Sequence, residues 1–341
     1  MPRMLFPVIL LIFISIFPNV KCTEDVGVYS WNTGGVGYNM NCMLNSWLYF
    51  SKVKQLDKFY LFANNFSFQS CNCYSESSGM VSKGWDCLFN VPGIINTNVV
   101  NEDIEHIPEK FNKKNLQETI FRSRKQIDSI LEETGTDYME SISILAKNVW
   151  DNMTLWARKD VDSIIYSNRV FEESKYIGLH IRRGDKLIKE ALLTETKVYL
   201  EEAVSYLKNK NVHVSEIKGI WLASDDPTVL YEVQYLSAEY FPEIKIENIE
   251  YISAKNTDEV KTQAFEQSYK PFINLLSDFE RLSKAFVFVG TYSSNIGRFV
   301  AVLRDSFGFS RDSSISVDNP PVWFPGGNSN PHGMYHKMYG H

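Results

Sequence analysis

The sequence has no excess of positive charge, and this lack narrows the possible functions. Its 341 residues include 35 Lys and Arg against 41 Asp and Glu, which gives a net charge of -6. Bulk nucleic-acid binding depends on broad basic surfaces, so this class is disfavoured. With 44% hydrophobic and 22% charged residues, and with no repeats or low-complexity tracts, the composition is that of an ordinary globular protein.

Long hydrophobic runs are also scarce. The sequence has one, at the N-terminus. Arg3 precedes an apolar run from Met4 to Phe17, and polar sequence begins after Cys22. The run is short for a transmembrane helix, which needs about 20 apolar residues. A signal peptide over residues 1–22 is therefore predicted, with an uncleaved Golgi-type anchor as the alternative. Either one predicts the secretory pathway, with the protein secreted or retained in the Golgi, and contact with a membrane only in the second case.

Cysteine is absent beyond Cys87. The four cysteines that follow the N-terminal segment gather in one short region, which suggests two local disulfides and agrees with secretion. They are Cys42, Cys71, Cys73 and Cys87. Three pairings remain open, and a metal site is the weaker alternative because the spacing of Cys71 and Cys73 is unusual for metal ligands. Two N-glycosylation sequons, at Asn65 and Asn152, predict a glycoprotein in this setting.

Two domains are expected from the length. The hydrophobic pattern predicts strands at 26–31, 59–62, 176–181, 217–223, 244–249 and 286–289, and helices at 39–53, 115–133, 139–158, 196–208, 227–238, 269–284 and 294–307. From Lys175 onward, strands and helices alternate regularly, which predicts βαβ units and a parallel sheet. The predicted domains are 23–165 and 166–341, the latter with an irregular tail from Ser313 packed by Trp323 and Phe324. A glycine-rich loop, Gly34 to Gly37, is either a tight turn or a close approach to a ligand.

The most informative motif runs from His180 to Lys186, with the sequence HIRRGDK, directly after an apolar strand. Three cations beside one turn need an anionic partner, and two planar guanidiniums suit a phosphate or diphosphate. An adhesion tripeptide at Arg183 to Asp185 is disfavoured, because a buried strand leads straight into it. Structural ion pairs between the arginines and nearby carboxylates are the stronger alternative.

Two further polar clusters follow predicted strands of the same half. One is Ser224 to Asp226, and the other runs from Gly290 to Asn295. Ligands in open α/β sheets lie beyond the carboxyl ends of the strands, so the three clusters are expected to meet there. The last cluster also begins a helix, where backbone N–H groups favour a phosphate; Ser293 or Ser294 could serve as the N-cap as well. Together they predict a nucleotide-like ligand.

These residues carry a resemblance. The segments 180–186, 222–227 and 278 through 291–295 resemble, in order and spacing, the catalytic domain of the α1,6-fucosyltransferases, Golgi enzymes that add core fucose to N-glycans. The resemblance is strong after residue 175 and faint before residue 90, where Gly34 to Asn39 and Gly84-Trp85 carry it. It implies an α/β, GT-B-like fold with two Rossmann-type domains, GDP-fucose as donor, inversion at the anomeric carbon, and neither metal nor cofactor.

The resemblance also implies roles for individual residues. Arg182 resembles the arginine that binds the β-phosphate and Lys186 the lysine on the phosphate side, while Glu190 occupies the position of the general base. His180 and Asp278 resemble residues that recognise guanine. The other expected site residues are Arg183, Asp185, Asp225, Asp226, Ser293, Ser294 and Asn295.

Each assignment has a structural alternative. His180 could be a buried strand histidine, Asp278 could pair with Arg281 one helical turn away, and Glu190 could be a solvated charge beside Lys189. No Asp-x-Asp pair follows a strand, and the adjacent Asp225 and Asp226 would point to different sides of an extended chain. The chemistry therefore favours arginines and a helix N-terminus over a metal for stabilising the departing diphosphate.

The sequence departs from the family pattern at two positions. Gly184 replaces the usual threonine and Asn295 a glutamine, and the family's C-terminal Src-homology-type β-barrel would lie beyond His341. The predicted function is an inverting transfer of fucose from GDP-fucose to a glycan, with α1,6 linkage on N-glycans. The alternatives are a fucosyltransferase for protein or another glycan, and an inactive glycan-binding relative.

Overall fold

The computed structural model describes twelve segments of the chain. They are residues 27–30, 36–53, 55, 59–62, 72–74, 81–92, 94–96, 131–167, 174–183, 194–242, 249–253 and 265–318. All statements below concern these residues. None of the helices among them is long and apolar enough to cross a membrane.

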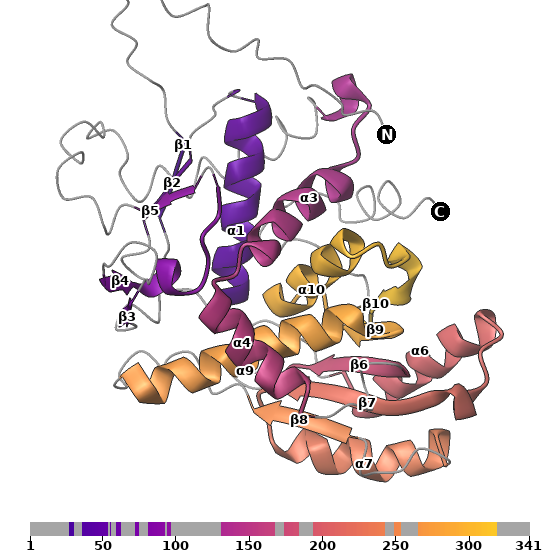
Figure 1. Cartoon of the computed structure of the whole chain (residues 1–341). Coiled ribbons are helices and arrows are strands. Elements are labelled where there is room, and N and C mark those ends of the chain that lie inside the picture. The colour runs from indigo at the N-terminus through magenta and orange to yellow at the C-terminus, as the bar shows by residue number, and fades with distance from the viewer. Residues whose placement is uncertain are drawn as a thin grey trace, which may run out of the picture.

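The C-terminal half forms a parallel sheet of five strands (Figure 1). The strands are β6 (Lys175–Ile181), β7 (Ile217–Ser224), β8 (Ile249–Ser253), β9 (Val287–Gly290) and β10 (Ser314–Ser316). Their spatial order is β8-β7-β6-β9-β10, and every neighbouring pair is parallel. This is the 3-2-1-4-5 order of a Rossmann-type sheet, in which the chain reverses direction across the sheet between β6 and β9.

Helices cover both faces of this sheet. They are α6 (Thr196–Asn209), α7 (Thr228–Tyr240), α9 (Phe265–Lys284) and α10 (Asn295–Ser306). Alternate residues of β6 serve different cores, because successive side chains of a strand point to opposite faces. Ile177 and Leu179 are buried with α6 and α7, whereas Tyr176 is buried with α9 and α10. The sheet therefore has an α6/α7 face and an α9/α10 face.

The N-terminal half contains a second parallel sheet, formed by β1 (Gly27–Ser30), β2 (Phe59–Phe62) and β5 (Ile94–Asn96) in the order β1-β2-β5. Helix α1 (Val36–Leu48), extended by a π-helical turn (Tyr49–Val53), connects β1 to β2. A short hairpin of β3 (Asn72–Tyr74) and β4 (Val81–Lys83) leads into the 3-10 turn Gly84–Cys87. Two parallel sheets confirm the predicted α/β, GT-B-like architecture; the domain boundary itself stays a prediction.

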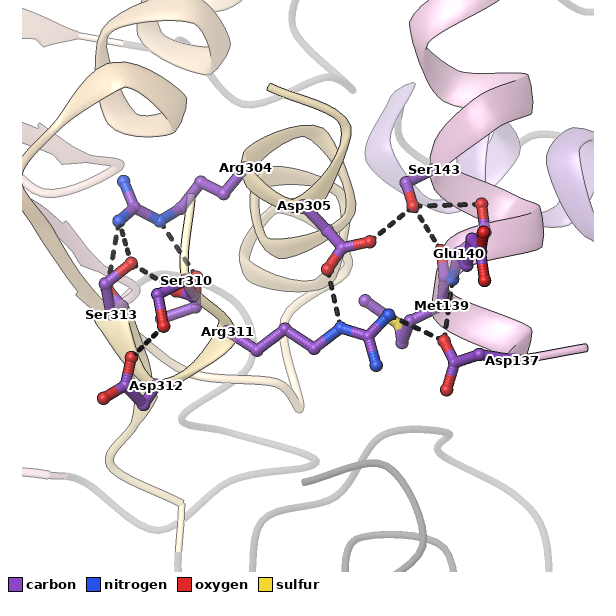
Figure 2. Close-up of polar contacts among 11 residues, drawn as sticks. Asp137, Met139, Glu140, Ser143, Arg304, Asp305, Ser310, Arg311, Asp312 and Ser313 are labelled. Carbon is purple, nitrogen blue, oxygen red and sulfur yellow. Dashed lines mark hydrogen bonds and ion pairs between the residues drawn. The ribbon is translucent and has the colours of Figure 1, made fainter. Parts of the chain in front are cut away.

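Two helices join the halves. They are α3 (Tyr138–Asp151) and α4 (Leu155–Ile165), and they share one hydrophobic core with α1, α9 and α10. Polar contacts reinforce this junction (Figure 2). Arg311 donates to Asp305 at the end of α10 (2.6 Å) and to Asp137 at the start of α3 (2.7 Å), and Ser143 of α3 donates to Asp305 (2.6 Å).

The predicted helix 139–158 is wrong as a single element, because the chain breaks between α3 and α4. Phe89 forms an antiparallel bridge with Met153. The backbone N–H of Thr154 donates to Leu88 O (2.8 Å), and its hydroxyl donates to Cys87 O (2.7 Å). These contacts draw Thr154 into an extended conformation, which a helix cannot contain. Asn152 of the second sequon lies in this break, and its glycosylation stays a prediction.

One further prediction needs correction, and another is largely untested. Residues 244–248 of the strand expected at 244–249 lie outside the described residues, and Ile249 begins β8. The tail expected to be irregular from Ser313 contains β10 and the 3-10 turn Arg311–Ser313. The fully buried Arg304 of α10 stabilises this strand by donating to Ser313 Oγ (2.6 Å) and Ser314 Oγ (2.9 Å) (Figure 2).

The prediction of two disulfides among the four clustered cysteines is wrong for Cys42. Cys42 forms no disulfide among the described residues and is partly buried on α1, against the core that joins the two halves. The pairing of the other cysteines stays a prediction. Several predicted features lie outside the described residues, and the predicted helix 115–133 lies largely outside them. The others are Asn65, Cys71, Gly34 and Gly35 of the glycine-rich loop, and Trp323 and Phe324.

Candidate functional site

The candidate site lies where the carboxyl ends of β6 and β9 meet. These strands are neighbours in register, with Leu179 opposite Val289. The motif that begins at His180 and the cluster that begins at Gly290 therefore leave the sheet side by side. This is the point where the strand order reverses, and crevices for nucleotides form there in doubly wound sheets.

Arg182 is oriented at this edge by a carboxylate. Its Nη1 pairs with Asp225 Oδ2 at 3.0 Å, and the other oxygen of Asp225 accepts the backbone N–H of Arg183 at 2.8 Å. Asp225 follows β7, which lies beside β6, so adjacent strands bring the two residues together. The side chain of Arg182 remains 26% exposed. The ion-pair alternative thus holds for Arg182, and it is compatible with a ligand because the pair fixes the guanidinium in place.

Arg183 points to the opposite face. Its guanidinium donates to Thr194 O (3.0 Å), to Thr196 Oγ1 (2.7 Å) and to Glu232 of α7 (3.1 Å). The side chain is buried at the start of α6. The two guanidinium groups of the motif therefore do not face one common ligand. Arg182 lies at the switch point, and Arg183 links α6 and α7 to the end of β6.

Asp225 and Asp226 diverge, as predicted from their adjacency. Asp226 Oδ1 accepts the backbone N–H of Thr228 (2.8 Å) and its hydroxyl (2.7 Å), which caps the first turn of α7. These hydrogen bonds lower the pKa of Asp226. The two carboxylates consequently serve different partners and do not converge on one point.

Asp278 is a buried carboxylate on the α9/α10 face. Trp221 of β7 donates its Nε1–H to Asp278 Oδ1 at 3.0 Å, while Oδ2 has no hydrogen-bond partner among the described residues. Burial raises the pKa of Asp278 well above its usual range, against the opposing effect of the Trp221 hydrogen bond. Arg281 is occupied elsewhere, since it donates to Ile165 O and lies 5.4 Å from the Trp221 ring.

His180 is buried at the end of β6. It lies opposite Ala223, two residues beyond Trp221 on the neighbouring strand. By strand alternation its side chain belongs to the same face as Trp221 and Asp278. The two residues expected to contact a nucleobase thus lie on one face of the sheet, the face to which Arg182 also belongs.

The loop between β9 and α10 is fixed by the segment after β10. Asp318 accepts the backbone N–H of Ser293 (2.8 Å) and its hydroxyl (2.9 Å), and Ser316 donates to the same carboxylate (3.0 Å). Ser316 Oγ also accepts the backbone N–H of Tyr292 at 3.1 Å. Asp318 was not anticipated from the sequence, because β10, the strand that precedes it, was not predicted either.

The first turn of α10 carries the remaining site residues. Ser294 is the N-cap residue, yet its side chain makes no capping hydrogen bond. Asn295 accepts from Arg298 through its side chain and from Asn41 Nδ2 through its backbone oxygen (2.8 Å). Burial lowers the pKa of Arg298 to about 10. The helix N-terminus is therefore held rigidly, with a serine hydroxyl beside its N–H groups.

Glycine allows this close packing at two points. A Cβ on Gly37 would come within 3.1 Å of the backbone of Asn295, and a Cβ on Gly297 within 2.1 Å of Thr291 O. Gly37 belongs to the glycine-rich loop singled out in the sequence. Its role in the structure is to seat α1 against the start of α10.

Asp185, Lys186 and Glu190 lie outside the described residues, so their predicted roles stay predictions. Trp221, Arg298 and Asp318 are contacts that the sequence did not indicate. Trp221 and Asp318 depend on hydrogen-bond partners 57 and 25 residues away, whereas the partner of Arg298 lies only 3 residues away in the same helix.

A pocket of about 600 Å³ opens beside this edge, on the α6/α7 face. It lies next to the candidate site, with Arg183 and Asp226 in its wall. The residues that line it are Arg183, Glu195, Thr196, Lys197, Asp226, Glu232, Tyr235 and Leu236.

A Rossmann-type sheet with an arginine and a helix N-terminus at its switch point defines an α/β protein with a candidate site for an anionic ligand at that point. A family model described as the N- and catalytic domains of alpha-(1,6)-fucosyltransferase matches residues 101–309, a span that contains His180, Arg182, Asp225, Asp278 and the first turn of α10. The chain belongs to this family of glycosyltransferases, which confirms the resemblance.

A curated relative is an alpha-(1,6)-fucosyltransferase of Caenorhabditis elegans. It is 29% identical over 161 residues, which make up 46% of this chain and 26% of the relative. The chain thus matches about a quarter of that protein's length, and the activity of the whole relative does not transfer to it directly.

The solved structures that it resembles are more distant. They include NodZ α-1,6-fucosyltransferase soaked with GDP-fucose (13% identity, TM-score 0.46, covering 82% of this chain and 91% of that one). POFUT1 in complex with GDP has 12% identity and a TM-score of 0.46, covering 83% and 95%. Arabidopsis thaliana FUT1 in complex with GDP has 10% identity and a TM-score of 0.49, covering 90% and 74%. These values are too low to indicate a function.

Proposed function

We propose that the protein is an inverting fucosyltransferase of the secretory pathway that moves fucose from GDP-fucose to a glycan, with α1,6 linkage on N-glycans. The observation that carries this proposal is that Arg182 and the start of α10 follow the neighbouring strands β6 and β9, on either side of the switch point of the sheet. A guanidinium and a helix N-terminus together suit a diphosphate. Membership in the family then favours fucose as the sugar that is transferred.

Asp278 supports guanine as the base of the donor. A buried carboxylate oxygen without a partner is costly unless a ligand donates to it. Guanine carries two adjacent N–H donors on its Watson–Crick edge, whereas uracil offers only one. The buried Oδ2 of Asp278, which lies on the same face as His180 and has no hydrogen-bond partner among the described residues, is therefore assigned to that edge.

Replacing Arg182 by lysine should weaken GDP binding by at least tenfold. Lysine retains the charge but cannot form the bidentate contact that an arginine makes with a phosphate. Isothermal titration calorimetry with GDP measures this directly. A variant that binds GDP as tightly as the wild type would remove Arg182 from the diphosphate site.

The neighbouring arginine provides a matched comparison. Arg183→Lys makes the same chemical change one residue along, but Arg183 is bound to Thr196 and Glu232 on the opposite face. It should lower the melting temperature while leaving GDP affinity within a few-fold of wild type. Equal losses of affinity in both variants would mean that the motif acts as a single cationic cluster.

We further propose that transfer needs no divalent metal. Negative charge on the leaving GDP is stabilised by Arg182, by Lys186 and by the N–H groups of α10. The carboxylates of Asp225 and Asp226 are engaged by separate partners and do not form a joint metal site. Fucose transfer should therefore keep its full rate in excess EDTA. Loss of activity in EDTA that Mn²⁺ restores would contradict this.

A further inference from the structure

The pocket on the α6/α7 face differs from the candidate donor site in its charge. Three carboxylates line it, those of Glu195, Asp226 and Glu232, against the two cations Arg183 and Lys197. Without a surplus of positive charge it does not favour a diphosphate. Carboxylates accept hydrogen bonds from hydroxyl groups and the cations donate them, so the lining suits a neutral ligand that carries many hydroxyls.

An exposed aromatic side chain completes the lining. Tyr235 of α7 is 81% exposed, and it lines the pocket together with Leu236. A sugar ring presents a face of C–H groups within a rim of hydroxyls. A flat aromatic surface next to several polar groups is complementary to both parts of such a ring, as in other small-molecule sites.

The pocket and the donor site share a wall. Arg182 and Asp225 form the ion pair at the switch point, while their neighbours Arg183 and Asp226 line the pocket. A ligand in the pocket would therefore contact the residues that directly follow Arg182 and Asp225 in the sequence, on the opposite face of the sheet from the proposed diphosphate site. An acceptor that receives a sugar from the donor must approach this edge as well.

We propose that this pocket is a subsite for a neutral sugar ring of the acceptor glycan, with Tyr235 as the stacking surface. That this sugar belongs to the acceptor of the transfer rests on the proposed function, whereas the binding of a sugar in the pocket does not. The carboxylate of Glu232, already oriented by Arg183 at 3.1 Å, accepts from the ring hydroxyls.

Tyr235→Ala should raise the KM for a neutral, sialic-acid-free N-glycan oligosaccharide by roughly 5- to 30-fold, the effect of truncating one well-placed aromatic contact. The KM for GDP-fucose should stay unchanged. Tyr235→Phe keeps the ring and should retain most of the affinity. Tyr231→Ala is the matched control, because Tyr231 lies one helical turn earlier on α7, is 70% exposed and does not line the pocket.

Saturation-transfer NMR with the same oligosaccharide gives a readout that needs no turnover. The signal should weaken in Tyr235→Ala and persist in Tyr231→Ala. Wild-type-like behaviour of Tyr235→Ala in both assays, or equal losses in both alanine variants, would overturn the subsite. If the wild type binds the oligosaccharide through Tyr235 but fails to bind GDP in calorimetry, the sugar pocket stands and the proposed function fails.

Discussion

Replacing Glu190 by glutamine is expected to slow fucose transfer about 10²- to 10⁴-fold, the usual contribution of a general base. Glutamine keeps the shape of the side chain and removes its basicity, so GDP binding should be unchanged. Single-turnover transfer from labelled GDP-fucose, combined with calorimetry, separates the two effects. The assignment rests on the family resemblance and on the position of Glu190 four residues after Lys186.

The described carboxylates are weaker candidates for the base. Both oxygens of Asp225 are engaged, by Arg182 and by the backbone of Arg183. Hydrogen bonds from Thr228 lower the pKa of Asp226, which makes that carboxylate less basic. If Glu190→Gln transfers at the wild-type rate, Asp226 is the next candidate. Glu202→Gln, an exposed position on α6, is the control and should leave the rate unchanged.

Most strands of the C-terminal sheet could be predicted from the sequence, and the reason is physical. Strands such as Lys175–Ile181 and Ile217–Ser224 are buried on both faces, so they appear as continuous apolar runs between amphipathic helices. β10 was not predicted, because its sequence Ser-Ile-Ser contains no such apolar run. Its place depends on the buried Arg304, which a local pattern does not reveal.

Distant contacts account for the other differences. The break at Asn152 results from the bridge between Phe89 and Met153, which local helical periodicity cannot anticipate. The different roles of Arg182 and Arg183 were accessible in part, since adjacent residues of a strand point to opposite faces. Which face holds the ligand depends on where α6, α7 and α9 pack, and only the assembled sheet determines that.

Removing the carboxylate of Glu280 is expected to destabilise the junction between the two halves by about 3 kcal/mol, the lower end of the cost of breaking a buried ion pair. Glu280 of α9 is buried, and its Oε2 accepts from Trp150 Nε1 (2.7 Å) and from Arg158 Nη1 (2.8 Å). Lys284 pairs with the other oxygen at 2.5 Å. Glu280→Ala would leave the buried indole N–H and the guanidinium without their acceptor.

Urea unfolding of Glu280→Ala measures this loss. The matched control is Asp162→Ala, which removes the more exposed carboxylate bound to the same Arg158. An exposed i,i+4 pair contributes only about 0.3–0.5 kcal/mol, so the control should unfold nearly as the wild type does. Equal losses in both variants would show that Arg158, rather than the buried carboxylate, stabilises the junction.

The same carboxylate should make stability depend on pH. Burial alone would raise the pKa of Glu280, but the charges of Arg158 and Lys284 outweigh it and lower the pKa below its ordinary value of 4.5. A lowered pKa in the folded state means that the stabilisation is complete above pH 4.5 and is lost as the pH falls through the lowered value. The difference in unfolding free energy between the wild type and Glu280→Gln should therefore shrink between pH 6 and pH 3. A difference that stays constant over this interval would mean that the charge of Glu280 contributes nothing to the junction.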